Sequence, residues 1–253
     1  MSAVSVKMSC RMAETVVLLH GFAGTRHAWD LVADRLDPER YRPLALDLRG
    51  HGEARDARPI TFAACVEDVV AQAPERFVLC GYSLGGRVAL HVALAHPERV
   101  SRLVLVATTA GIEDPALRAE RRAADERLAA DTERGTIEEF AERWSRQPLF
   151  AGTPSGALAF WRADLLRNDP AALAAVLRGI GAGAMEPLWD RLGELAGLPV
   201  TIIAGERDGR YTSVGRRIAG AVPGARLLVV PGAGHGLPRE APQAVAAAIR
   251  ATE

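Results

Sequence analysis

Short apolar runs alternate along the chain with longer segments in which apolar residues recur at helical spacing. The apolar runs, rich in leucine and β-branched residues, predict strands at residues 15–19, 43–48, 77–80, 103–107, 200–204 and 226–230. The segments of helical spacing predict helices at residues 27–36, 62–72, 84–95, 212–221 and 241–251. Because strands and helices alternate, the pattern predicts an α/β fold with a mostly parallel sheet flanked by helices.

The alternation is interrupted between residues 111 and 195, where the sequence contains no strand candidate. Amphipathic patterns there predict helices at 115–132, 136–145, 155–166 and 170–179, and the glycine-rich run 179–183 is interpreted as a hinge or loop. We therefore expect residues 1–110 and 196–253 to form the core and residues 111–195 to form a helical lid. Such an insertion can fold over the carboxyl edge of the sheet, where open α/β sheets bind ligands.

The motif Gly81-Tyr82-Ser83-Leu84-Gly85 lies between the third predicted strand and the helix that follows it. A strand, a sharp turn and a helix are the context that a G-x-S-x-G nucleophile elbow requires, because glycines allow the bend that exposes the serine. The alternative is a glycine-rich turn in which Ser83 serves only as a helix N-cap. The nucleophile-elbow interpretation is favoured because the chain also offers a candidate acid and a candidate base for Ser83.

A serine needs an imidazole to take its proton and a carboxylate to orient that imidazole. Asp208 follows the fifth predicted strand and His235 follows the sixth, which is the chain order serine, acid, histidine of such elbows. Asp208 could instead cap the next helix, and Asp114 after the fourth strand is a rival acid. The backbone N–H groups of Leu84 and Phe22 are the expected oxyanion-hole donors.

Composition narrows the classes of partner. With 253 residues, 49% of them hydrophobic, and a formal net charge of zero, the chain offers no electrostatic footprint for nucleic acid. No apolar run reaches the length of a membrane span, and residues 1–11 lack the apolar core of a secretory signal. The three cysteines fit no metal spacing, and no nucleotide-binding loop is evident, so we expect no cofactor, no metal and a cytoplasmic location.

Arginine provides nearly all of the basic residues, since Lys7 is the only lysine. Genomic base composition explains most of this bias, and most lid arginines are expected on solvated helix faces. Arg87, however, lies one helical turn after Ser83, on a similar face. A guanidinium beside a nucleophile suits a carboxylate, which it can bind through two hydrogen bonds, better than a neutral ester. A small anionic substrate is therefore the expected partner.

The serine, acid and histidine at strand ends make the chain resemble the α/β-hydrolase superfamily over nearly its whole length. A closer resemblance is to the 2-succinyl-6-hydroxy-2,4-cyclohexadiene-1-carboxylate (SHCHC) synthase family of menaquinone biosynthesis. The segments that carry it are the elbow 81–89, the lid segments 118–121, 144–150 and 166–168, and the run 205–208. Lid segments vary freely among unrelated hydrolases, so matches there are more specific than the triad.

The closer resemblance implies a lyase that eliminates pyruvate from a polycarboxylate, with His235 and Asp208 activating Ser83 to abstract a ring proton. It implies carboxylate-binding arginines and pocket residues at the following positions: Arg87, Arg121, Arg167, Trp144 and Tyr82. The chain departs from the family pattern at Arg49, Glu53, Ser145 and Gly236. These departures concern the shape of the pocket more than the triad.

Two other functions remain open on the sequence. A carboxylesterase, thioesterase or C–C bond hydrolase would use the same serine, acid and histidine. A ligand-binding protein with a vestigial triad would keep the fold without the chemistry, although the complete set of Ser83, Asp208 and His235 argues against it.

Overall fold

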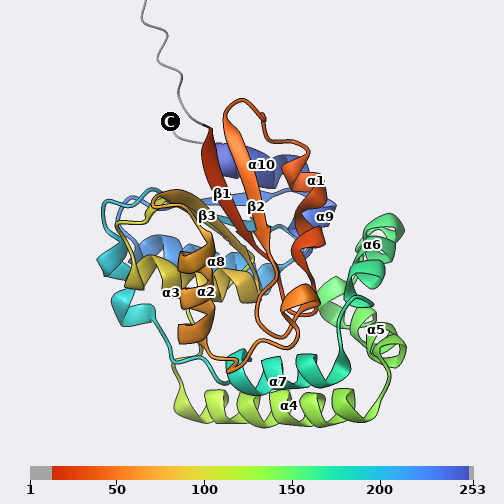
Figure 1. The fold of residues 1–253 in the computed structure, drawn as a ribbon. Helices are drawn as coiled ribbons and strands as arrows, with labels where there is room; N and C mark the ends of the chain where they lie inside the picture. The colour runs from red at the N-terminus through yellow and green to blue at the C-terminus, as the bar shows by residue number, and fades with distance from the viewer. Residues whose placement is uncertain (1–12, 251–253) are drawn as a thin grey trace, which may run out of the picture.

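The computed structural model describes residues 13–250, which fold around a six-stranded parallel sheet (Figure 1). The strands are β1 (Glu14–Leu19), β2 (Tyr41–Leu46), β3 (Phe77–Tyr82), β4 (Val100–Val106), β5 (Val200–Gly205) and β6 (Arg226–Val230). Their order across the sheet is β2-β1-β3-β4-β5-β6, and each neighbouring pair is parallel. All carboxyl ends of the strands therefore meet at one edge, as the alternating pattern predicts.

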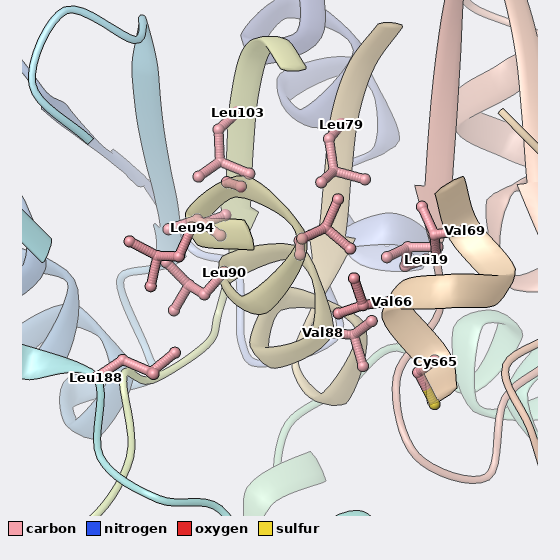
Figure 2. Close-up of a cluster of buried hydrophobic side chains, with 14 of the residues drawn as sticks. Leu19, Cys65, Val66, Val69, Leu79, Val88, Leu90, Leu94, Leu103 and Leu188 are labelled. Carbon is pink, nitrogen blue, oxygen red and sulfur yellow. The ribbon is translucent and has the colours of Figure 1, made fainter. Parts of the chain in front are cut away.

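Each face of the sheet buries its own apolar cluster because successive side chains of a strand point to opposite faces. In β1, Val17 and Leu19 belong to one cluster, whereas Val16 and Leu18 belong to the other. The first cluster is covered by α2 (Phe62–Gln72), α3 (Leu84–Ala95) and α8 (Gly209–Ala221), and part of it is drawn in Figure 2. The second is covered by α1 (Asp30–Ala33), α9 (Leu237–Glu240) and α10 (Pro242–Arg250). The result is a three-layer fold.

Four longer helices connect β4 to β5: α4 (Pro115–Arg134), α5 (Ile137–Ser145), α6 (Ser155–Leu165) and α7 (Pro170–Ile180). The short 3-10 helices Pro148–Phe150 and Trp189–Leu195 complete this helical insertion. In Figure 1, α4 and α7 run side by side along one end of the molecule, and these two helices contact each other closely. The insertion also contacts the sheet layer, since Val176 and Ile180 of α7 join the first apolar cluster.

Side-chain caps fix where the inserted helices begin. The Asp114 carboxylate accepts the N–H groups of Ala116 and Leu117 at the start of α4, and Thr136 forms a capping box with Glu139 at the start of α5. The run 179–183, interpreted from sequence as a hinge or loop, is helical up to Ile180 and turns only from Gly181 onward.

The helix predicted at residues 27–36 is wrong in type and length. The chain forms a 3-10 helix at Arg26–Trp29 and then a single α-helical turn, α1. The N–H groups of Arg35 and Leu36 bond to carbonyls three residues earlier, which tightens and ends the helix. Pro38 follows, and a proline disfavours helical geometry at the residue before it.

The second strand is Tyr41–Leu46, two residues earlier than predicted. Pro43 is tolerated there because β2 is an edge strand, where one ladder donor can be spared. The strand stops before Leu48 because the N–H of Leu48 donates to Nε2 of His20 at 3.0 Å. The loop that follows β2 is thereby joined to the end of β1.

No helix in the described part of the chain is long and apolar enough to cross a membrane. Cys65 and Cys80 are buried and free, and burial raises the pKa of the Cys65 thiol to about 12. Cys10 and residues 1–11, which the prediction about a secretory signal concerned, lie outside the described residues.

Candidate active site

Ser83 occupies the turn between β3 and α3 and has a backbone φ of 52°, a left-handed value that a non-glycine residue adopts only under strain. Hydrogen bonds hold it there. Its N–H donates to the carbonyl of Val106 at 2.9 Å, and its carbonyl accepts the hydroxyl of Thr108 at 2.7 Å. Ser83 makes no side-chain cap to α3, which disfavours the interpretation of this serine as a helix N-cap.

The glycines of the elbow are required by close backbone contacts. A Cβ on Gly81 would overlap the carbonyl of Gly85, and a Cβ on Gly85 would overlap the carbonyl of Leu19. A Cβ on Gly86 would lie 2.5 Å from Cβ of Thr108. The strand, the turn and the helix can therefore approach closely enough to present the serine only without side chains at these positions.

The structure brings together the serine, histidine and aspartate that the sequence singles out. Nδ1 of His235 lies 2.7 Å from Oδ2 of Asp208, and Nε2 of His235 lies 3.2 Å from Oγ of Ser83. With Nδ1–H donating to the carboxylate, Nε2 is free to accept the serine proton. His235 and Asp208 are both buried, which limits competition from water.

Asp208 performs both tasks considered for it. Its Oδ1 accepts the N–H of Tyr211 and so caps α8, while Oδ2 contacts His235. The rival Asp114 is exposed and is committed to the start of α4. His235 therefore pairs with Asp208.

The loop that carries His235 is fixed by Glu240, a residue that the sequence analysis missed. The Glu240 side chain is only 2% exposed and accepts the N–H groups of Gly234 at 2.8 Å and Gly236 at 3.0 Å, the two neighbours of the histidine. It also accepts a hydrogen bond from Nη2 of Arg207 at 2.7 Å. Since Arg207 precedes Asp208, this carboxylate joins the loops of the acid and the base.

Gly236, one of the departures from the family pattern, has a packing reason. A Cβ there would lie 2.5 Å from the Trp161 ring and 2.9 Å from Oε1 of Glu240. Aromatic rings also surround the histidine, since the rings of Tyr211 and Tyr82 lie 4.6 and 5.4 Å from it, between centroids. The imidazole is thus held on several sides.

The two expected oxyanion donors both line a cavity that contains Ser83. Leu84 is the first residue of α3, so its N–H has no acceptor within the helix. Phe22 lies in the loop after β1, next to Ala23, whose N–H donates to Nε2 of His51 at 3.2 Å. Burial lowers the pKa of His51 well below its ordinary value, which keeps Nε2 available as an acceptor.

This cavity measures about 190 Å³ and lies between the helical insertion and the carboxyl edge of the sheet. The core contributes Ser83, Arg87, Arg210 and Tyr211 to its lining, among others, and the insertion contributes residues from three of its helices and the segment that follows α5. It is therefore the space in which a substrate would meet the serine.

Arg87 brings a buried positive charge to this cavity. It is 8% exposed, and its Nη1 donates to the carbonyl of Ile180 in α7 at 2.9 Å. Burial lowers the pKa of its guanidinium to about 10. A buried arginine with a single recorded hydrogen bond keeps donors available for an anion.

Arg121 and Arg210 add two further guanidinium groups. Arg121 of α4 donates from Nε to the buried Asp125 at 2.8 Å, which orients it at the cavity wall. Arg210 is an exposed residue of the cavity lining, and its guanidinium lies over the Tyr211 ring. Arg210 is not among the residues predicted from sequence because arginine is abundant, although its position two residues after Asp208 is a usable signal.

The remaining expected pocket residues are placed differently from one another. Trp144 of α5 lines the cavity, 5.1 Å from the Phe22 ring between centroids. Tyr82 lines a smaller neighbouring cavity of about 50 Å³, which Phe22 and Trp144 share. Arg167 lies outside both linings: its side chain is 56% exposed and its Nε is 4.0 Å from Asp164.

Within residues 13–250, no group of three or more histidine, cysteine, aspartate or glutamate side chains is arranged to hold a metal ion.

Comparison with known proteins shows which sequences and structures the chain resembles. An SHCHC synthase of Enterobacter sp. (strain 638) is 32% identical to the chain, over 92% of this chain and 89% of its own length. A Bacillus subtilis (strain 168) protein provisionally named for the same activity is 34% identical, over 91% and 87%. Among solved structures, MenH from S. aureus superposes with a TM-score of 0.86 at 29% identity, covering 93% of this chain and 91% of that one.

The model of the alpha/beta hydrolase family matches residues 16–248. This range contains the elbow, the Asp208 and His235 loops, and all six strands apart from the first two residues of β1. The fold and the resemblance to SHCHC synthases expected from sequence are both confirmed. The chain belongs to the alpha/beta hydrolase family.

Proposed function

We propose that the protein is a lyase that eliminates pyruvate from the enolpyruvyl-bearing precursor of SHCHC, in menaquinone biosynthesis. The observation that carries the proposal is the combination of a Ser83–His235–Asp208 hydrogen-bonded set with arginines in the same cavity. The similarity to SHCHC synthases at 32% and 34% identity supports it.

In this reaction the triad acts as a base. His235 takes the hydroxyl proton of Ser83 while Oγ removes the proton from the ring carbon next to the succinyl carbonyl. The electron pair moves through the ring, and the carbon–oxygen bond to the enolpyruvyl group breaks. The departing enolpyruvate takes the proton held by His235 at its methylene carbon and becomes pyruvate, which leaves the imidazole neutral again. No water is consumed, because the products are SHCHC and pyruvate.

Removing a proton next to a carbonyl places negative charge on the carbonyl oxygen. The N–H groups of Phe22 and Leu84 are the donors that we assign to that charge. Arg87, Arg121 and Arg210 are placed to bind carboxylates of the substrate and hold the ring against Ser83. We include Arg210 in this set, and we leave Arg167 out of it, because of their positions relative to the cavity.

We further propose that the insertion of residues 111–195 acts as a lid on the core formed by the rest of the chain. Arg121, Trp144 and Ile180 reach the cavity from three of its helices. A closed cavity would exclude water, which favours elimination over hydrolysis.

Pyruvate formation tests the proposal directly, through a coupled lactate dehydrogenase assay with the purified protein and the precursor. We expect pyruvate from the wild type and none from Ser83→Ala. Absence of pyruvate together with brisk hydrolysis of p-nitrophenyl acetate would instead assign the chain to the carboxylesterases, thioesterases or C–C bond hydrolases. Absence of both activities would favour a ligand-binding protein.

A further inference from the structure

The loop that carries Phe22 is held by side chains from the helical insertion. Ala23, the next residue, has a φ of 61°, so its conformation is strained and needs support. Its carbonyl accepts a hydrogen bond from Nδ2 of Asn168 at 3.1 Å, while its N–H is bound by His51. Both polar groups of this strained residue are thereby fixed from outside the loop.

Asn168 lies in the turn between α6 and α7 and is only 7% exposed. Besides the bond to Ala23, its Oδ1 accepts the N–H of Gly52 at 3.0 Å. One amide group of the insertion thus bridges the loop after β1 and the loop after β2.

Asp164, at the end of α6, makes a second connection. It is 4% exposed, and its Oδ2 accepts the N–H of Thr25 at 3.0 Å. Its Oδ1 accepts the hydroxyl of the same threonine. Thr25 closes the loop before the 3-10 helix that follows, so Ala23 and Thr25, which come after Phe22, are both tied to the insertion.

We infer that Asn168 and Asp164 are positioning residues that set the Phe22 loop, so that the oxyanion hole is complete only when the end of α6 is docked on the core. The inference rests on the proposed role of the Phe22 N–H. Because a donor displaced by about 1 Å loses much of its effect, these contacts act on the rate rather than on substrate affinity.

The variant Asn168→Asp tests this with little change of shape. An aspartate keeps an acceptor for Gly52 but replaces the Nδ2 donor to the Ala23 carbonyl with an oxygen. The control is Arg178→Ala, which removes exposed hydrogen bonds from α7 to Glu126 and Glu133 of α4, none of which involves the Phe22 loop. Both variants loosen the insertion, and only the first releases the Phe22 loop.

The readout is inactivation by diethyl p-nitrophenyl phosphate, followed by release of p-nitrophenolate. Oγ of Ser83 bonds to phosphorus, the hydroxyl proton passes to His235, and p-nitrophenolate leaves, while the phosphoryl oxygen uses the oxyanion donors. We expect the inactivation rate and kcat to fall roughly 10- to 100-fold in Asn168→Asp, with KM changed less than about threefold. Arg178→Ala should keep the wild-type rates.

Thr25→Val provides a second variant from the core side, in case Asn168→Asp does not fold. It removes the hydroxyl bond to Asp164 and should lower the inactivation rate in the same direction. Wild-type inactivation rates in the folded variants, with only the melting temperature lowered, would overturn the inference. A wild type that reacts with the phosphate but releases no pyruvate would leave the inference standing and refute the proposed function.

Discussion

Replacing Arg87 with methionine should stabilise the folded protein while lowering its activity on an anionic substrate. Burial lowers the pKa of the guanidinium from its ordinary value of 12.5 to about 10, so the folded state disfavours the charge at every pH below about 10. At about 1.4 kcal/mol for each pKa unit, the cost at neutral pH is roughly 3 kcal/mol. Methionine is similar in length and carries no charge, so it avoids this cost.

The loss of the hydrogen bond to the Ile180 carbonyl offsets part of the gain, by about 1 kcal/mol. A net gain of about 2 kcal/mol raises the melting temperature by roughly 4 to 8 °C for a chain of this size. Thermal and urea unfolding measure the effect. Such a gain is expected where a site keeps a buried charge for binding rather than for stability.

The same variant should lose activity on an anionic substrate only. One charge-assisted hydrogen bond contributes roughly 1.5 to 3 kcal/mol, so kcat/KM for the precursor should fall about 10- to 150-fold. Hydrolysis of neutral p-nitrophenyl acetate, if the wild type shows it, should be nearly unchanged. The matched control is Arg146→Met, an exposed arginine paired with Glu142, which should change neither property.

Equal losses on the anionic substrate and the neutral ester would contradict the role of Arg87 in carboxylate binding. A lower melting temperature in Arg87→Met, with Arg146→Met unchanged, would contradict the desolvation argument. The two results are independent, since the first concerns the cavity and the second the folded state.

Two further predictions concern the histidines and their loops. Glu240→Gln replaces one of the two accepting oxygens with an amide nitrogen, so the N–H of either Gly234 or Gly236 loses its acceptor and kcat should fall roughly 10- to 100-fold. Glu206→Gln on the neighbouring turn should not change kcat, and equal rates in both variants would show that the His235 loop needs no such support. Burial lowers the pKa of His51 in the folded state. As the pH falls through about 6.5, His51 therefore becomes protonated in the unfolded state but not in the folded state, which favours unfolding. By pH 5.5 this difference should lower the free energy of unfolding by about 1 kcal/mol. Urea unfolding from pH 7.5 to 5.5 should show that loss in the wild type and less of it in His51→Gln; an unchanged pH dependence in that variant would contradict the assignment.

The sequence predicts the positions of Ser83, Asp208 and His235 well because parallel strands bring their carboxyl ends to one edge. Ser83 directly follows β3, and Asp208 and His235 lie in the loops after β5 and β6, strands that their apolar runs make recognisable. Knowing only which residues end strands is therefore enough to place three side chains together, although they lie up to 152 residues apart in the chain.

Other features depend on tertiary contacts that no local pattern carries. Glu240, Asp164 and Asn168 act through backbone groups of distant loops, so their sequence neighbourhoods resemble ordinary helix ends. The direction of a side chain in the turn between two inserted helices is equally unreadable, so the resemblance that implies Arg167 as a pocket residue cannot show that its side chain is exposed and outside the cavity lining. The short α1 was overestimated because its apolar periodicity continues past the point at which the helix tightens.

The most direct test of the account is the stoichiometry of pyruvate release from the enolpyruvyl precursor, measured together with SHCHC by its absorbance. The account predicts one pyruvate for each SHCHC in the wild type, and neither product above background in Ser83→Ala or His235→Ala. Wild-type protein that consumes the precursor without releasing pyruvate, or a Ser83→Ala variant with full turnover, would contradict it.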